Sequence, residues 1–232
     1  MPIYKLIDDL VFPPPSDAQP DGLLAVGGDL SAKRMLLGYQ MGIFPWYSEG
    51  QPILWWSPDP RTIFEPDNII ISKALRQTLN KGIYEVTFDN AFAEVIKACK
   101  EVPRKGQQGT WITSEMQDAY IQLHKLGYAH SVESWCEGKL VGGLYGVSLG
   151  RCFFGESMFF RKTDASKVAL VVLLQRLKAW SFQIIDAQMT TPHLLSLGAK
   201  EVPRNVFLKR LEEAMCFPTL KGRWDGTEDS TM

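Results

Sequence analysis

Three apolar runs decide the fold: KLVGGLYGVSLG at 139–150, CFFGESMFF at 152–160 and FQIIDAQ at 182–188. A tight turn at Gly150-Arg151 joins the first two, which predicts a β-hairpin of strands 140–149 and 152–160. A long apolar segment at 165–180 predicts a buried helix. The third run then predicts a further strand, 182–188, so this part of the chain has an α/β pattern.

Polar side chains interrupt two of these apolar strands. Glu156 lies within the second strand, and Asp186 and Gln188 lie at the end of the third. Ionised carboxylates are rarely buried without partners, and the carboxyl ends of strands in α/β sheets are common ligand sites. We therefore predict a polar site here. Two simpler interpretations stay open: Glu156 reaches water from an edge strand, or Asp186 caps the helix that begins near Pro192.

Side-chain alternation gives a second expectation for the strand 152–160. It places Phe154, Glu156 and Met158 on one face, and Phe153, Ser157 and Phe159 on the other. A bulge at Gly155 would change that register.

The helix at 165–180 is apolar on nearly every side. Leu170, Leu173 and Leu177 form a stripe at i, i+3 and i+7. Spacing alone allows this stripe to line either the core or a pocket, and the core is the simpler interpretation.

The composition divides the chain into three regions. Residues 1–62 are rich in proline and tryptophan and have too few regular elements for an independent core, so we expect a small N-terminal domain packed on a larger one. Residues 63–220 have a regular α/β pattern. The end, 221–232, is polar, and we expect it to be disordered.

Composition also excludes several functions. The 232 residues carry a net charge of −1, so a long duplex tract of nucleic acid is not the expected ligand. Four cysteines without CxxC spacing and three histidines argue against a structural zinc site. The acidic, proline-containing N-terminus is unlike a signal peptide, and no apolar run is long enough to span a bilayer. We expect a soluble, cytoplasmic protein without a metal, and a monomer.

Two groups of side chains are candidates for contact with nucleic acid. Lys73 and Arg76 share one helix face, with Lys81 at its end and Arg61 nearby. A solvated helix surface is the simpler interpretation of that group. The second group consists of tryptophans in proline-rich or glycine-flanked segments, where flat rings stack on a base or wall a pocket: Trp46, Trp55, Trp56 and Trp111. Structural anchoring explains at least two of these four.

Ten short segments, in order from about Phe12 to Phe207, resemble the bacterial leucyl/phenylalanyl-tRNA–protein transferases. They are PDGLLAVGGDLS, GIFPWY, PILWWSPDPR, GTWIT, AHSVE, LVGGLYGV, FFGESMF, ASK, IDAQ and HLLSLGA. The resemblance implies an α/β (α+β) fold in which a small N-terminal domain is docked on a GNAT-like acyltransferase domain. It also implies transfer of leucine or phenylalanine, and methionine less well, from charged tRNA to proteins that begin with Arg or Lys, which marks them for degradation by the N-degron pathway.

The same resemblance implies roles for particular residues. Asp186 and Gln188 match the catalytic pair, with Glu156 in the same polar network. Trp46 and Trp111 match rings that hold the aminoacyl-adenosine end. The residues that match the wall of the side-chain pocket are Leu144, Phe153, Met158, Leu170, Leu173, Leu177 and Ile185. The basic helix with Lys73, Arg76 and Lys81 is then the expected tRNA contact.

An aminoacyl ester is already activated, so the reaction requires no metal, ATP or other cofactor, and the enzyme has to hold amine and ester in attack geometry. Two rival functions remain. A coenzyme A-dependent acetyltransferase predicts a glycine-rich loop before residue 165, and the sequence there is RKTDASK. A non-catalytic RNA-binding module predicts a surplus of basic residues.

Overall fold

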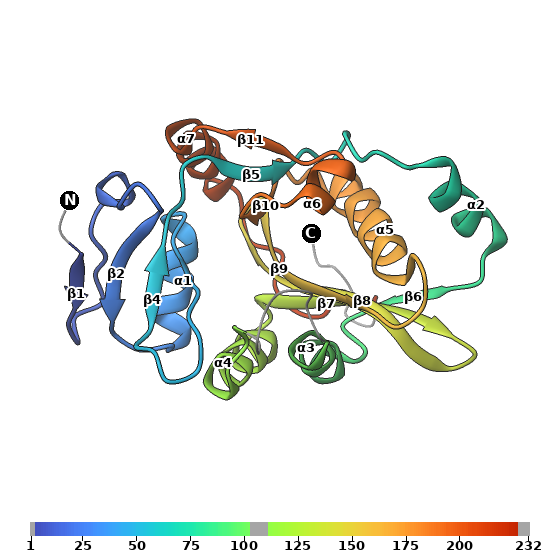
Figure 1. Cartoon of the computed structure of the whole chain (residues 1–232), viewed down its shortest axis with the longest axis horizontal. Helices are drawn as coiled ribbons and strands as arrows, with labels where there is room; N and C mark the ends of the chain where they lie inside the picture. The colour runs from blue at the N-terminus through green and yellow to red at the C-terminus, as the bar shows by residue number, and fades with distance from the viewer. Residues whose placement is uncertain (1–2, 103–110, 227–232) are drawn as a thin grey trace.

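The computed structural model describes residues 3–102 and 111–226, which form two β-sheets and their covering helices (Figure 1). Within these residues the smaller sheet has four strands in the order β1-β2-β4-β3, and the larger has seven in the order β11-β5-β10-β9-β8-β7-β6. The mixed α/β fold and the separate N-terminal unit are therefore confirmed.

The N-terminal unit is built from residues 4–56 and lies at one end of the molecule (Figure 1). It contains β1 (Tyr4–Leu6), a 3-10 turn (Pro15–Asp17), β2 (Leu23–Gly27), α1 (Ala32–Gln40), β3 (Phe44–Pro45) and β4 (Leu54–Trp56). Met35, Tyr39 and Trp55 are fully buried in one apolar cluster with residues of the larger unit, such as Phe154 and Phe207. The small sheet thus shares its core with the larger domain, because its own elements enclose too little apolar surface.

The larger unit begins at β5 and contains the remaining elements. These are β5 (Arg61–Phe64), α2 (Lys73–Lys81), β6 (Glu85–Phe88), α3 (Phe92–Glu101), α4 (Ser114–Lys125), β7 (Ala129–Cys136), β8 (Lys139–Leu149), β9 (Cys152–Phe160), α5 (Ala165–Ala179), β10 (Ile184–Gln188), α6 (Pro192–Ser196), β11 (Lys200–Val202) and α7 (Arg204–Met215). The hairpin β8-β9, the helix α5 and the strand β10 all match the sequence-based expectation.

Helices cover both faces of the large sheet. Helix α5 packs on β7, β8 and β9 from one side, and α3 packs on the same strands from the other (Figure 1). Phe153 belongs to the apolar cluster of α5, and Phe154 to the cluster of α3. Gly142 allows the close approach of α5, since a Cβ there would lie 2.5 Å from the Cβ of Ala165.

A bulge in β9 corrects the simple alternation. Tyr145 pairs with Ser157 and Gly146 pairs with Gly155, which leaves Glu156 as the extra residue. Phe153 and Met158 therefore both face α5, whereas strict alternation separates them.

Beyond the bulge the two parallel strands of the sheet separate. Strand β10 pairs with β9 only as far as Asp186 opposite Phe154. The pairing of β10 with β5 also shifts register between Asp186 and Gln188. The ends of β9 and β10 thus diverge and leave room between them.

The expectation of a disordered end is wrong for residues 221–226. Trp224 is buried, its ring stacks on His130, and its backbone N–H donates to Asp89 Oδ2 at 2.7 Å. Residues 227–232 lie outside the described residues.

Among residues 3–102 and 111–226, none of the helices is long and apolar enough to cross a bilayer.

Candidate functional site

A pocket of about 310 Å³ lies where β9 and β10 diverge. One side consists of apolar residues from β8, β9, β10 and α5, and polar groups lie at the strand ends. Its lining residues are Phe64, Leu144, Tyr145, Phe153, Gly155, Glu156, Ser157, Met158, Leu170, Leu173, Ile185, Asp186, Ala187, Gln188, Thr191, His193 and Leu194. A largely apolar cavity with a few converging polar groups is the usual form of a ligand site.

Two buried tyrosines hold the Glu156 carboxylate. Tyr39 of α1 donates to Oε1 at 2.8 Å, and Tyr120 of α4 donates to Oε2 at 2.6 Å. The two hydroxyl oxygens are themselves 2.7 Å apart. Burial raises the pKa of both tyrosines well above its usual value, so they remain protonated donors.

Burial also raises the pKa of Glu156 to about 7, although the hydrogen bonds from the tyrosines oppose the increase. Glu156 is thus the extra residue of a bulge, has an ionisation near neutrality and faces the pocket. The interpretation as an edge-strand residue in free solvent does not fit these contacts.

Asp186 forms a buried ion pair with Arg61. The guanidinium donates through Nε to Oδ1 at 2.8 Å and through the second terminal nitrogen to Oδ2 at 2.7 Å. Both side chains are at most 1% exposed. The rings of Phe44 and Phe207 lie 4.9 Å and 4.6 Å from the guanidinium carbon. This two-point geometry fixes the carboxylate and excludes water from it.

Gln188 joins the two acids. Its backbone N–H donates to Asp186 Oδ1 at 2.9 Å, and its side-chain Nε2 donates to Glu156 Oε1 at 3.2 Å. Its φ of 53° lies in the left-handed region, which is uncommon for a non-glycine residue. Asp186 therefore holds the backbone turn that directs the Gln188 amide toward Glu156, and the three predicted polar residues do lie together.

Most of the predicted pocket wall lines this cavity: Leu144, Phe153, Met158, Leu170, Leu173 and Ile185. Leu177 differs. It is fully buried in the apolar cluster behind the wall and is not among the lining residues. The stripe on α5 is therefore divided: Leu170 and Leu173 line the pocket, and Leu177 belongs to the core.

The structure places the two candidate stacking rings outside the lining of the pocket. Trp46 follows β3 and packs edge-on against Trp56, with ring centroids 5.6 Å apart. Trp111 precedes α4 and packs on the large apolar cluster. Their segments are neighbours, because the Tyr47 hydroxyl lies 3.3 Å from Thr113 Oγ1. Both rings are half-buried, and their contact with a substrate stays a prediction.

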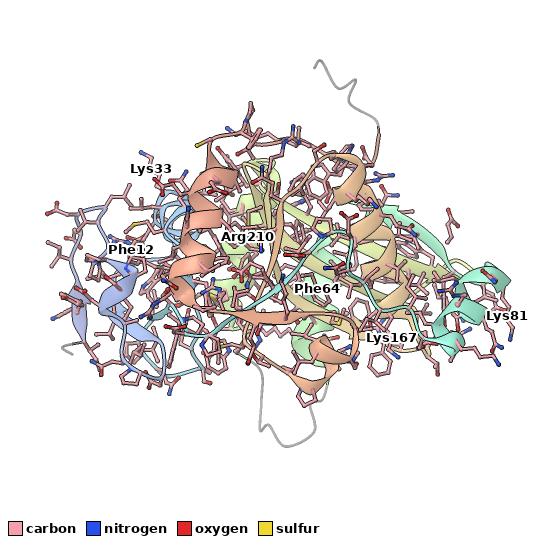
Figure 2. All side chains as sticks on the ribbon, turned by 90° about the horizontal axis from the view of Figure 1, so that it is seen from above. Phe12, Lys33, Phe64, Lys81, Lys167 and Arg210 are labelled. Carbon is pink, nitrogen blue, oxygen red and sulfur yellow. The ribbon has the colours of Figure 1, made fainter. Side chains whose placement is uncertain are left out.

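The basic helix is exposed and distant from the N-terminal unit. Lys73, Arg76 and Lys81 are exposed on α2, and Figure 2 shows Lys81 at the end of the molecule opposite Phe12. Arg61 does not belong to this surface, because it is buried against Asp186. Leu75 anchors α2 by packing on Val168 and Val171 of α5, which explains why the charged face points outward.

Sequence reasoning missed Tyr39 and Tyr120, and it assigned Arg61 to the basic surface instead of to the site. Arg61 is the first residue of the buried strand RTIF. A charged residue at that position was the available signal of a buried partner. Tyr39 and Tyr120 each lie on the apolar face of an ordinary amphipathic helix. Nothing in either helix pattern distinguishes a hydroxyl that binds a carboxylate from a core tyrosine.

The arrangement suits the transfer of an activated group to an amine. The pocket can take an apolar side chain, and next to it lie an oriented amide and a carboxyl group whose pKa is near neutrality. A general base functions best when its pKa is close to the working pH.

Two family models match the sequence. The model of the leucyl/phenylalanyl-tRNA protein transferase matches residues 63–212, and the model of the N-terminal domain of the same protein matches residues 28–59. Curated relatives named leucyl/phenylalanyl-tRNA–protein transferase are similar over nearly the full chain. The one from Desulfatibacillum aliphaticivorans is 58% identical over 224 residues, which cover 97% of this chain and 96% of the relative. The one from Myxococcus xanthus is 56% identical over 226 residues, with 97% of each covered.

Solved structures give weaker similarities. The structure of L-PGS from Bacillus licheniformis has a TM-score of 0.41 and 13% identity, and the match covers 73% of this chain and 54% of that one. A GCN5-related N-acetyltransferase from Kribbella flavida has a TM-score of 0.36 and 8% identity, with 73% and 59% covered.

Proposed function

The chain belongs to the leucyl/phenylalanyl-tRNA protein transferase family and is an aminoacyltransferase, and from this premise we propose its substrates and the roles of its residues. It transfers leucine or phenylalanine, and methionine less well, from charged tRNA to the α-amine of proteins that begin with Arg or Lys. The reaction takes place in the cytoplasm and marks the acceptor for degradation. The observation that carries the proposal is the apolar pocket with Glu156 and Gln188 at its polar end.

The pocket supports an apolar donor side chain. Phe153, Leu170, Leu173 and Ile185 form a wall without charge, and Met158 adds a flexible side chain that adapts to different shapes. In such a pocket one methylene changes the transition-state free energy by about 1–3 kcal/mol. Leucyl, phenylalanyl and methionyl donors should therefore react at graded rates, and valyl and isoleucyl donors slowly, because branching at Cβ crowds the entrance.

The polar end supports a role in attack by the amine. Because Nε2 of Gln188 is engaged by Glu156, its carbonyl oxygen is left to accept from the attacking amine and to orient it. The amine nitrogen bonds to the ester carbonyl carbon, the bond from that carbon to the ribose oxygen breaks, and the amine proton finally resides on the ribose oxygen. Glu156, with a pKa of about 7, is the group suited to hold that proton in between.

Asp186 acts as a positioning residue in this scheme. Both of its oxygens are engaged by Arg61, and Oδ1 also accepts the backbone N–H of Gln188. Both carboxylate oxygens are therefore already engaged by donors, and these contacts keep the end of β10 rigid. Because the ester is already activated, the main task of the enzyme is to hold the reacting groups rigidly in place.

The rival coenzyme A reaction fits the start of α5 less well. Such enzymes place a pyrophosphate at free N–H groups of a helix N-terminus. Here Ala165 and Ser166 are buried, and an ideal Cβ at Gly142 would lie 2.9 Å from the Ser166 nitrogen. Strand β8 thus packs close to this helix start, and the Ala165 N–H is already engaged by the Lys162 carbonyl oxygen at 3.2 Å.

A direct assay tests the proposal. The chain is incubated with leucyl-tRNA and a peptide that begins with Arg, and mass spectrometry measures the addition of leucine to the peptide. The matched peptide has an acetylated N-terminus, which removes the attacking amine. Gln188→Ala should abolish most of the transfer, and Gln122→Ala, at an exposed glutamine on α4, should not. Absence of transfer by the unaltered chain from leucyl-, phenylalanyl- and methionyl-tRNA alike would refute the proposal.

A further inference from the structure

Trp224 follows α7 near the end of the chain and packs against a residue of the pocket wall. Its ring is 5% exposed and contacts the ring of Phe153, with centroids 5.9 Å apart. Phe153 in turn lines the pocket. Trp224 and the pocket residues Leu144, Leu170 and Ile185 belong to one apolar cluster. A segment that looks like a polar tail in sequence therefore supplies part of the packing under the pocket wall.

Several contacts from different elements hold Trp224 in place. Its ring stacks on His130 of β7 with centroids 3.7 Å apart and an angle of 6° between the planes. Its backbone N–H donates to Asp89 at 2.7 Å, and its carbonyl oxygen accepts from Arg176 of α5 at 2.8 Å. Trp180 packs on it edge-on at 5.0 Å. Such a set of contacts gives the ring one position rather than several.

Phe153 also lies close to the backbone of β8. An ideal Cβ at Gly146 would lie 2.5 Å from Cζ of Phe153, so the ring occupies the space that a side chain at 146 would need. Gly146 is paired with His130, the residue on which Trp224 stacks. The Phe153 ring thus contacts both strand β8 and Trp224.

We propose that Trp224 is a positioning residue for donor selection, which limits the depth of the side-chain pocket by supporting Phe153 from behind. The inference rests on the proposed function, since it assigns the pocket to the donor side chain. When Trp224 is shortened, Phe153 can withdraw into the vacated space, and the pocket accepts the larger ring of phenylalanine more readily relative to leucine.

The experiment compares kcat/KM for phenylalanyl-tRNA and leucyl-tRNA in each variant, because the ratio cancels any loss that affects both donors. Trp224→Ala should raise the phenylalanine-to-leucine ratio of kcat/KM about tenfold. An effect of this size is expected when a pocket gains room for one to two methylene groups. Trp224→Phe, which keeps a ring over His130, should restore the ratio to nearly that of the unaltered chain. Trp55→Ala removes a tryptophan that is also buried, 0% exposed against 5% for Trp224, but lies in the N-terminal sheet, and it should leave the ratio unchanged.

A double-mutant comparison isolates the contact between the rings. In a Phe153→Leu background, Trp224→Ala should no longer change the ratio, because no ring is left to withdraw. If Trp224→Ala does not fold, as circular dichroism would show, Trp224→Leu provides the same comparison with a larger side chain.

The outcomes separate this inference from the proposed function. An active unaltered chain whose donor ratio stays constant in Trp224→Ala and Trp224→Leu, or shifts equally with and without Phe153, overturns the role of Trp224 alone. An unaltered chain that transfers neither amino acid overturns the proposed function and this inference with it.

Discussion

Removing Asp186 should destabilise the fold, although Asp186 lies at the end of a strand. Its partner Arg61 is 1% exposed and would be left as an unpaired buried charge. Breaking a buried ion pair in this way costs about 3–5 kcal/mol, a large part of a typical total stability of about 5–15 kcal/mol. Asp186→Ala therefore combines a loss of activity with a loss of stability, and so does Arg61→Ala.

Urea unfolding monitored by circular dichroism measures the effect. With a slope of about 3 kcal/mol per molar urea, each single variant should lower the unfolding midpoint by about 1–1.7 M. The double variant Arg61→Met with Asp186→Leu removes both charges, and it should recover most of the stability without recovering activity. A midpoint for Asp186→Ala within about 0.3 M of the unaltered chain, or additive losses in the double variant, would show that the pair is not the buried unit described here.

Three further predictions concern the acid, the pocket wall and the basic helix. Burial raises the pKa of Glu156 from 4.5 to about 7, so between these pH values the folded chain retains a proton that the unfolded chain loses. The free energy of unfolding should therefore fall as the pH rises from about 4.5 to 7. Glu156→Gln should remove this decrease, as measured by urea unfolding across the same pH range. Leu173→Ala should enlarge the pocket and favour phenylalanyl over leucyl donors in kcat/KM. Leu177→Ala, one turn further along α5, should lower the free energy of unfolding by about 2–5 kcal/mol with an unchanged donor ratio. Lys73→Ala with Arg76→Ala should raise the KM for charged tRNA and leave the KM for the peptide unchanged. The slope of log K against log salt concentration should become shallower by about two. A change of less than twofold in tRNA affinity at low salt would show that the helix is merely solvated.

Local sequence signals predicted the elements that carry the site. The hairpin β8-β9, the buried helix α5 and the polar end of β10 follow from hydrophobic periodicity and turn residues, which act over a few neighbours in the chain. The resemblance to the family added residues that periodicity could not assign to a pocket. Leu170 and Leu173 line the cavity, for example, although their spacing equally suits a core.

What the sequence could not predict depends on contacts between distant residues. Arg61 pairs with a residue 125 positions away, so its sequence neighbours contain no sign of the partner. The sequence allows a bulge near Gly155, but only the pairing of β8 with β9 shows that Glu156 is the extra residue and that Phe153 and Met158 share one face. The same holds for Trp224: a single aromatic residue in a polar segment has no periodicity, and its burial is decided by His130 and Asp89.

The polar centre also has a consequence for the order of folding. Tyr39 meets Glu156 across 117 positions, and Arg61 meets Asp186 across 125. Closing such long loops costs entropy before their contacts stabilise anything, so contacts of this kind form late. During synthesis the first sheet emerges well before β10, and the partners of Tyr39 and Arg61 do not yet exist. We expect a nascent chain to remain inactive until residue 188 has left the ribosome. The unfolded part of the growing chain is therefore not exposed to its own transfer reaction.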